Sequence, residues 1–469
     1  MTNIRQNGFT QEPEWPVRSI LDTDLYKITM QQAVMAHFPD AQVHYRFTNR
    51  STNMKFTQES VDKIRNFVNN LSHLSLSQEE EEWLKNTCPY LKPDYLNHLR
   101  SYRFKPKEQV KVEFVEDESG SQPFGQIHID VQGSWADAIL YEVPVMSIVS
   151  EVYFTDIDTQ WTLRGQRAQA RTKSHTMVSS GIRYSEFGTR RRRSYETHKL
   201  VIEGLLQGEK DAFDSVPSCS GKLVGTSNVH FARLFGLAPI GTMAHEWTMG
   251  IAAIGGYDHA NLRALQLWDA VYSPPNFVPN SPGHDLTIAL TDTFSTTVFW
   301  QDLLSSDEGR QIAKRWRGIR QDSGDSKAFA RKAKEEYDLL GIDSTTKAII
   351  YSDGLDVSRC LDLASYSKQV GIGASFGVGT HLTNDFRRDE DPGDPHNADP
   401  DDDQWIRNHE NSLKSKPLNI VIKLHSINGR NAVKISDDLT KNTGDAEEVR
   451  LCKRRFGIEV GLEDNVEDA

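Results

Sequence analysis

Short apolar segments that each end in a polar cluster recur between about residue 180 and residue 380, and a helical pattern follows each of them. Strands that alternate with helices predict a parallel sheet. Polar residues at the carboxyl ends of such strands are typical of the catalytic face of a (β/α) barrel, so we expect their side chains to meet in one polar site. The segments span residues 184–189, 223–228, 239–245, 288–293, 318–325, 349–354 and 374–380.

The residues before and after this region have a different pattern. Residues 43–47, 110–114 and 127–131 alternate apolar and polar side chains, as the strands of a half-buried antiparallel sheet do. Residues 419–424 and 432–435 predict two more strands around the turn Asn428-Gly429, and we expect these strands to return to the first sheet. The predicted fold class is therefore α/β, with an irregular (β/α) barrel and a discontinuous α/β sandwich domain. The expected domains are an N-terminal sandwich domain (1–150), the barrel (151–388), an acidic disordered insert (389–415) and a C-terminal segment of the sandwich domain with an acidic tail (416–469).

Two acidic stretches account for the net charge of −12. Residues 389–403 contain eight acids, three prolines and no Lys or Arg, a composition typical of disorder. We interpret this insert either as a mobile flap or as an extension particular to one lineage. The tail from Phe456 adds five acids without Lys or Arg, so the rest of the chain is close to neutral. This balance argues against binding nucleic acid or an anionic membrane through bulk charge.

The four cysteines favour a reducing compartment. They lie far apart, form no Cys-x-x-Cys pair and are too few to staple a chain of 469 residues, which also argues against a zinc site. The N-terminus lacks the apolar region of a signal peptide, and no uninterrupted apolar stretch approaches the roughly 18 residues of a membrane span. We therefore expect a cytoplasmic protein, with entry into the nucleus left open.

Two loops at strand ends have the composition of a phosphate site. Gly377-Val378-Gly379-Thr380 can offer backbone N–H groups and a hydroxyl to a phosphate, although glycines at a strand end also make simple tight turns. Ser352-Asp353-Gly354 ends the preceding segment in the same way, and late strands of a barrel often form one phosphate site together. The predicted phosphate-binding residues are Ser352, Asp353, Gly354, Gly377, Gly379 and Thr380.

A third strand end concentrates charge. Arg320-Gln321-Asp322-Ser323-Gly324-Asp325 contains a cation and two carboxylates, which require partners if they are buried. One interpretation is an internal ion-pair network. The other is a binding site, in which Arg320 pairs with a planar carboxylate while Asp322 and Asp325 bind a ribose diol or hydrated Mg²⁺.

Arginines and histidines that follow strand ends are further candidates for residues of the site. Four arginines, Arg190 to Arg193, follow Phe187-Gly188-Thr189 and predict either a solvated or nucleic-acid-binding surface, or one or two side chains that face anions in the site. His245 also follows a strand end. A lone histidine is more often structural, but a neutral imidazole is a suitable nucleophile. His230 is a weaker candidate for that role.

Taken in order, these motifs resemble those of the nicotinate phosphoribosyltransferases, which are type II phosphoribosyltransferases, and the layout is similar to that of fungal members. The similarity extends from about residue 18 to about residue 452. The motifs are Asp22-Thr23-Asp24-Leu25-Tyr26-Lys27-Ile28-Thr29-Met30, Glu186-Phe187-Gly188-Thr189-Arg190-Arg191, Gly225-Thr226-Ser227-Asn228, Gly241-Thr242-Met243-Ala244-His245-Glu246-Trp247, Arg320-Gln321-Asp322-Ser323-Gly324-Asp325 and Phe376-Gly377-Val378-Gly379-Thr380.

The resemblance implies a sandwich domain joined to an irregular barrel, in a homodimer whose active sites lie at the subunit interface. It implies that nicotinate and 5-phosphoribosyl 1-pyrophosphate form nicotinate mononucleotide and pyrophosphate, in the Preiss-Handler salvage route to NAD. Mg²⁺ is the implied cofactor, and ATP is an implied co-substrate whose hydrolysis is coupled to the transfer. Neither a nucleic acid nor a membrane is an implied partner.

The resemblance also implies roles for individual residues. The nicotinate ring is expected between Phe187 and Tyr26, with Tyr26 reaching from the other subunit. Arg320 is the first choice for the carboxylate, and Asp322 or Asp325 for ribose. The other assignments are Thr189 and Ser227 as nearby hydroxyl donors, Arg190 for the phosphoribosyl side, His245 as the catalytic histidine that ATP phosphorylates, and Asp322 or Asp325 for Mg²⁺.

Ser227 bears on which pyridine substrate the site accepts, and two alternative classes of function stay open. Related nicotinamide phosphoribosyltransferases carry an aspartate at this place, where a second carboxylate would repel nicotinate. Rival enzymes are nicotinamide or quinolinate phosphoribosyltransferases. A rival of another class is an inactive barrel that binds nucleic acid through its arginines, but a binding module has no need of Tyr26, Phe187, His245 and Arg320 together.

Overall fold

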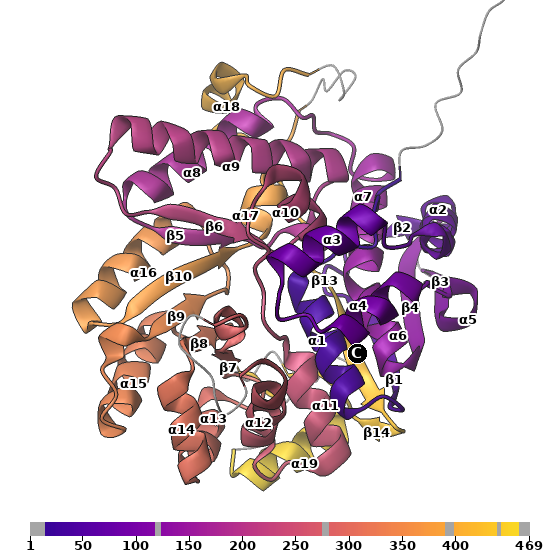
Figure 1. Ribbon diagram of the computed structural model, residues 1–469. Coiled ribbons are helices and arrows are strands. Elements are labelled where there is room, and N and C mark those ends of the chain that lie inside the picture. The colour runs from indigo at the N-terminus through magenta and orange to yellow at the C-terminus, as the bar shows by residue number, and fades with distance from the viewer. Residues whose placement is uncertain (1–14, 118–122, 274–280, 390–397, 439–441, 459–469) are drawn as a thin grey trace, which may run out of the picture.

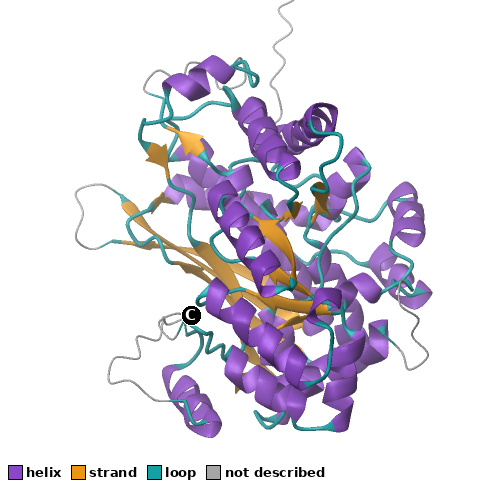
Figure 2. Ribbon diagram, turned by 90° about the vertical axis from the view of Figure 1, so that its left-hand side faces the viewer, coloured by secondary structure: helices purple, strands orange, loops and turns teal. Residues whose placement is uncertain are grey.

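The computed structural model describes residues 15–117, 123–273, 281–389, 398–438 and 442–458. Two six-stranded sheets organise these residues, and helices pack against both of them (Figures 1 and 2). One sheet is antiparallel and the other is parallel. The α/β class predicted from the sequence is therefore confirmed.

The antiparallel sheet has the strand order β14-β13-β1-β4-β2, and β3 also pairs with β4. Alternation along β1 is as predicted: Val43, Tyr45 and Phe47 are buried, while the residues between them are partly exposed. Strand β13 pairs antiparallel with β1, Tyr45 lying opposite Leu424, so the C-terminal part of the chain completes the N-terminal sheet. The strands are β1 (Gln42–Asn49), β2 (Phe56–Thr57), β3 (Val110–Glu116), β4 (Phe124–Ser134), β13 (Ile420–Ile427) and β14 (Arg430–Asn431).

The helices that cover this sheet include a long apolar stretch. The helical stretch Trp135–Asp156 has the length and composition of a membrane span, but 89% of its apolar window is buried inside the fold, as in the core helix of a globular protein. Its last part, α7, packs on β13 and on α2. The helices of this region are α1 (Leu25–His37), α2 (Gln58–Asn70), α3 (Gln78–Thr87), α4 (Pro93–Ser101), α5 (Pro106–Gln109), α6 (Trp135–Ala138) and α7 (Glu142–Asp156).

The parallel sheet corresponds to the predicted irregular barrel and has the order β6-β5-β10-β9-β8-β7; within the described residues its end strands β6 and β7 do not pair with each other. Six of the seven expected segments form its strands. The segment 239–245 differs: within the described residues it makes only one parallel bridge, from Pro239 to Thr226 beside β6. Proline cannot donate a backbone hydrogen bond, so it does not continue a ladder. The strands are β5 (Arg183–Glu186), β6 (Lys222–Thr226), β7 (Ile288–Leu290), β8 (Gly318–Gln321), β9 (Ala348–Tyr351) and β10 (Gly373–Val378).

Helices connect these strands and pack around them (Figure 1). Short polar side chains cap several of them: Asn228 begins α10, Asp325 begins α15 and Asp356 begins α16. The helices are α8 (Gln166–Ser179), α9 (Tyr195–Ser215), α10 (Val229–Phe235), α11 (His245–Gly255), α12 (Ala260–Tyr272), α13 (Thr296–Leu304), α14 (Asp307–Arg315), α15 (Ser326–Leu339), α16 (Val357–Val370), α17 (Thr380–Thr383) and α19 (Ala446–Phe456).

The prediction that residues 389–415 are disordered is wrong for residues 398–415. Helix α18 (Asp403–Asn408) forms there, and β12 (Lys414–Ser415) pairs with β11 (Phe386–Arg387). Two acids of this segment form salt bridges with arginines of the barrel: Asp401 pairs with Arg167, and Asp402 pairs with Arg164. Residues 390–397 and the acidic tail from 459 lie outside the described residues.

The predicted strand at 432–435 is also wrong. After the turn at Asn428-Gly429 the chain pairs with β13 only through β14, and it then leaves the sheet. Lys434 makes one isolated bridge, to Thr443, while the backbone N–H of Ile435 donates to the Thr293 carbonyl beyond β7. The segment after β14 is therefore part of the barrel's polar end.

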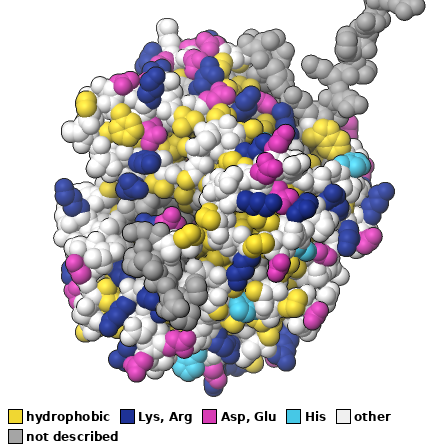
Figure 3. All heavy atoms as spheres, viewed as in Figure 1, with side chains coloured by type: hydrophobic (Ala, Val, Ile, Leu, Met, Phe, Trp, Pro, Cys, Tyr) yellow, Lys and Arg dark blue, Asp and Glu magenta, His cyan; other side chains and the backbone are white. Residues whose placement is uncertain are grey.

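Two of the four consecutive arginines lie in the protein interior. Arg192 and Arg193 are both fully buried, so they do not form a solvated basic surface. On the face shown in Figure 3, Lys and Arg side chains are interspersed with Asp and Glu. Arg192 makes two hydrogen bonds of 2.8 Å to the Asp22 carboxylate, and Arg193 packs on the rings of Phe154 and Phe386. Burial alone would raise the pKa of Asp22, but Arg192 lowers it to about 2.

Replacement of Arg192 by leucine is expected to lower the free energy of unfolding by about 3–5 kcal/mol, because it leaves the Asp22 carboxylate buried without its partner. Urea unfolding followed by circular dichroism measures this change. Lys334→Met is the matched control, because Lys334 pairs with Asp338 on the exposed face of α15 and should leave the stability nearly unchanged. Equal losses in the two variants would contradict the structural role of the Arg192–Asp22 pair.

Candidate active site

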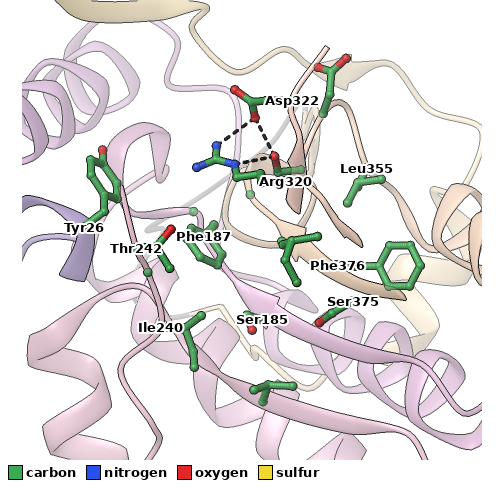
Figure 4. A pocket seen from close by; sticks show the side chains of 18 of the residues that line it. Tyr26, Ser185, Phe187, Ile240, Thr242, Arg320, Asp322, Leu355, Ser375 and Phe376 are labelled. Atoms are coloured by element: carbon green, nitrogen blue, oxygen red, sulfur yellow. Dashed lines mark hydrogen bonds and ion pairs between the residues drawn. The ribbon is translucent and has the colours of Figure 1, made fainter. Parts of the chain in front are cut away.

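A cavity of about 1120 Å³ lies at the polar end of the barrel and continues between its strands. Both domains line it, because α1 contributes Tyr26 while the barrel contributes Phe187, Arg320 and Asp322 (Figure 4). The structure therefore brings together most of the predicted site residues. Those that line the cavity are Tyr26, Phe187, Arg190, Arg320, Asp322, Ser352, Asp353, Gly354, Gly377, Gly379 and Thr380.

The glycine loop fits closely against an aromatic ring. The Phe187 N–H donates to the Val378 carbonyl at 2.8 Å, which places the ring beside the loop. A Cβ atom at Gly377 would lie 3.3 Å from the Phe187 ring, and one at Gly379 would lie 3.3 Å from the Phe187 carbonyl oxygen. The glycines therefore leave space both for the ring and for the approach of a ligand to the backbone.

Tyr26 lines the same cavity as Phe187 within one chain. Its hydroxyl donates to Glu142 at 3.4 Å, and the guanidinium carbon of Arg190 lies 5.8 Å from its ring centroid. The resemblance placed Tyr26 in the site of the other subunit. In this structure the two aromatic side chains border one space without a second chain.

Arg320 is held by neighbours on two adjacent strand ends. Its Nη2 donates to Asp322 at 2.9 Å and its Nε donates to the Ser352 hydroxyl at 2.9 Å (Figure 4). The ion pair of the first interpretation is therefore present. Because the guanidinium also lines the cavity, the binding role of the second interpretation stays a prediction. Burial would raise the pKa of Asp322, but Arg320 and His245 hold it well below its usual value, so Asp322 is ionised.

The other two of the four consecutive arginines face the cavity. Arg190 is 41% exposed and donates to Glu142 at 3.1 Å. Arg191 also lines the cavity and donates from Nε to the Ile420 carbonyl at 2.8 Å, so β13 positions it. The expectation that one or two of the four arginines face the site is thus in agreement with the geometry.

Thr189 and Ser227 are buried beside the cavity and are absent from its lining in the described part of the chain. The Ser227 hydroxyl donates to Asp24 at 2.7 Å, and the Thr189 hydroxyl accepts a 3.4 Å hydrogen bond from the Asn228 side chain. Their hydroxyls reach a ligand only if these neighbours release them. His230 is likewise engaged, with the Tyr195 hydroxyl at 2.9 Å.

His245 stands at the first residue of α11 and contacts three elements of the barrel's polar end. Its Nδ1 lies 3.1 Å from the Thr293 hydroxyl, and its Nε2 lies 3.0 Å from Asp322 Oδ2. The Lys434 ammonium lies 2.9 Å from the same Nε2. Burial and the charge of Lys434 lower the pKa of His245, so the imidazole is neutral at pH 7.

The sequence prediction missed three residues of this cluster, namely Asp292, Thr293 and Lys434. Asp292 is buried, and its two oxygens lie 3.6 Å from His245 Nε2 and 3.2 Å from Lys434 Nζ. Asp292 and Thr293 end one of the seven recurring segments, so the sequence pattern could have identified them as candidate site residues. Lys434 has no such local signal, because only the fold brings residue 434 to this place.

The cluster contains the donor atoms that a divalent cation needs. One ligand atom from each of His245, Asp292 and Asp322 lies within 4.8 Å of the other two. Asp292 Oδ1 is buried and has no hydrogen-bond partner among the described residues, and carboxylate oxygens are ligands that suit Mg²⁺. Asp325, the other predicted ligand, does not belong here: its carboxylate accepts the N–H groups of Lys327 and Ala328 at the start of α15.

Comparison with known proteins gives one consistent family. The sequence profile of the nicotinate phosphoribosyltransferase (NAPRTase) family matches residues 182–393 and 403–460, and the profile of its N-terminal domain matches residues 21–150. The nicotinate phosphoribosyltransferase of Saccharomyces cerevisiae is 38% identical over 94% of this chain and 95% of its own length. The nicotinate phosphoribosyltransferase of Methanosarcina acetivorans is 38% identical over 94% of this chain and 98% of its own length.

Solved structures agree with the sequence comparisons. The crystal structure of nicotinate phosphoribosyltransferase from Porphyromonas gingivalis superposes with a TM-score of 0.77 at 33% identity, covering 94% of this chain and all of the other. The enzyme from Vibrio cholerae gives a TM-score of 0.78 at 34% identity, with 96% of each chain covered. These similarities cover the residues of both six-stranded sheets.

Replacement of Lys434 by methionine is expected to raise the pKa of His245, because it removes the positive charge that opposes protonation of the imidazole. Titration of the ring proton signals by NMR measures this, with His245→Asn assigning the signal. In the unmodified protein the apparent value should lie below about 6.5. An unchanged value in Lys434→Met, equal to that in the Lys334→Met control, would contradict the proximity of the two groups.

Proposed function

This chain belongs to the nicotinate phosphoribosyltransferase family, and we propose that it transfers the phosphoribosyl group of 5-phosphoribosyl 1-pyrophosphate to nicotinate. The pyridine nitrogen attacks the anomeric carbon of the ribose, and pyrophosphate leaves with the electron pair of the broken C–O bond. The products are nicotinate mononucleotide and pyrophosphate. Nicotinate mononucleotide is a precursor of NAD, so the reaction belongs to a salvage route.

One observation carries this proposal. A single cavity presents an aromatic ring, a guanidinium and a glycine loop, which match the three parts of the product. The flat pyridine fits against Phe187, and its carboxylate pairs with Arg320. The backbone of Gly377 and Gly379 suits the 5-phosphate, together with the loop Ser352-Asp353-Gly354.

We expect the acid to be preferred over the amide because two guanidinium groups line the cavity, each held by a carboxylate, Arg320 by Asp322 and Arg190 by Glu142. Arg320 and Arg190 both line the cavity, and Ser227 adds no carboxylate beside them. An aspartate at position 227 would stand next to buried Asp24, which already has its pKa raised by burial. A second carboxylate there would repel a nicotinate anion.

Mg²⁺ is the proposed cofactor, with Asp292 and Asp322 as its protein ligands. When bound, it would neutralise charge on the departing pyrophosphate. The residues of the chain supply the other requirements: Arg190 and Arg191 attract the anionic substrate, and Arg320 keeps Asp322 ionised. Asp322 is also placed to accept a ribose hydroxyl.

ATP is the proposed co-substrate, and His245 is the residue that it phosphorylates. A neutral imidazole has the lone pair that such a step requires, and His245 is neutral because of its burial and Lys434. Hydrolysis of the phosphohistidine couples ATP to transfer if the phosphorylated form binds phosphoribosyl pyrophosphate more tightly than the free form does. We further propose that the enzyme is a cytoplasmic homodimer, with access to the nucleus also compatible with its composition.

The purified protein is expected to release pyrophosphate from nicotinate and 5-phosphoribosyl 1-pyrophosphate with Mg²⁺, faster when ATP is present. Nicotinamide and quinolinate, assayed side by side, should give at least about tenfold lower kcat/KM, because only nicotinate presents a single carboxylate to the guanidinium. Liquid chromatography of the mononucleotides identifies the product. Preference for either rival pyridine would replace the proposed substrate, and no product with any of the three would exclude the transferase reaction.

Arg320→Lys is expected to raise the KM for nicotinate by about ten- to a hundredfold, because lysine keeps the charge but loses the planar fork. The KM for 5-phosphoribosyl 1-pyrophosphate should change much less. Lys416→Arg is a matched exchange at an exposed position of the cavity wall, and it should leave both constants near their original values. An unchanged KM for nicotinate in Arg320→Lys would remove this residue from the carboxylate site.

A further inference from the structure

Lys434 reaches the reactive end of His245 from the C-terminal segment. Its Nζ lies 2.9 Å from His245 Nε2 and 3.2 Å from Asp292 Oδ2, and its side chain is only 12% exposed. The Thr293 hydroxyl lies 3.1 Å from the other ring nitrogen, Nδ1. Asp322 Oδ2 lies 3.0 Å from the same Nε2. In the tautomer whose Nδ1–H donates to Thr293, the Nε2 lone pair therefore lies between the ammonium of Lys434 and the carboxylate of Asp322, and it accepts a hydrogen bond from the ammonium.

The backbone that directly follows Lys434 is fixed to the barrel at two points. The Ile435 N–H donates to the Thr293 carbonyl, and Asp437 accepts both the N–H and the hydroxyl of Thr296. Between them, Ser436 is fully buried with a φ of 71°, a left-handed conformation that is costly for a residue other than glycine. A salt bridge to Asp292 alone does not require such a conformation, because a lysine reaches a carboxylate from many backbone positions.

We propose that Lys434 is a further catalytic residue, whose ammonium binds the phosphoryl group while it is transferred from ATP to His245. This rests on the proposed phosphorylation of His245. In the free enzyme the ammonium occupies the place beside Nε2 and keeps the lone pair oriented. When the γ-phosphate arrives, the ammonium exchanges its hydrogen bond to Nε2 for bonds to the phosphoryl oxygens, while Asp292 holds it from the other side.

The Nε2 lone pair of neutral His245 forms a bond to the γ-phosphorus, and the bond from that phosphorus to the β,γ-bridging oxygen breaks. ADP leaves with the electron pair. The proton on Nδ1 stays in place, donated to Thr293, and the ammonium of Lys434 compensates the charge of the phosphoryl oxygens that now lie on the imidazole.

The test follows phosphoryl transfer without the other substrates. Full-length protein is mixed with MgATP labelled in its γ-phosphate, and acid-labile, base-stable label on the protein is measured over time. Unmodified protein should take up label and His245→Asn should not. Lys434→Met should take up label about a hundredfold or more slowly, Lys434→Arg should recover a large part of the rate, and Lys334→Met should match the unmodified protein.

The outcomes separate the two proposals. Labelling of Lys434→Met at the rate of the unmodified protein overturns the role of Lys434 and leaves the phosphorylation of His245 intact. Equal slowing in Lys434→Met and Lys434→Arg, with circular dichroism spectra like that of the unmodified protein, also overturns it, because a charge that binds phosphoryl oxygens should be replaceable by another. No label on the unmodified protein, although it forms nicotinate mononucleotide, overturns the histidine step and this role together.

Discussion

The buried ammonium group of Lys27 is the constraint on which the arrangement of the two domains depends. It is fully buried on α1 and pairs with Glu142 of α7 and Glu246 of α11. An unpaired charge in this place would cost several kcal/mol, so α1 is stable only where both carboxylates meet it. Glu142 also accepts from Arg190 in the cavity wall, and Glu246 directly follows His245. The same cluster that joins the sandwich to the barrel therefore sets one wall of the cavity and the start of α11.

The parts of the fold that the sequence could predict are those with a short-range pattern. Alternation identified β1, β3 and β4, and the recurring segments identified six parallel strands, because each pattern reflects burial within a few residues. The loops around Phe187, Arg320 and Gly377 could be placed in one site for the same reason, since the carboxyl ends of parallel strands meet at one edge.

The parts that could not be predicted depend on long-range partners. Arginine is usually a surface residue, yet Arg192 and Arg193 are buried. Asp22 pairs with Arg192, and the ring of Phe154 packs against Arg193. The acids at 401 and 402 suggest disorder until Arg164 and Arg167 are placed beside them. Lys434 is the most consequential case, because its local sequence predicts a strand while β13 and Asp437 divert the chain toward His245. In each case the deciding partner is remote in the sequence.

We have proposed that one cavity, formed by α1 and the ends of β5, β8, β9 and β10, binds all parts of the mononucleotide. A crystal structure of the protein with nicotinate mononucleotide would show where each part binds. We expect electron density for the pyridine ring against Phe187, for its carboxylate at Arg320 and for the phosphate on the loop of Gly377 and Gly379. A ring or a phosphate bound elsewhere in the molecule, with this cavity filled only by water, would exclude the cavity as the binding site.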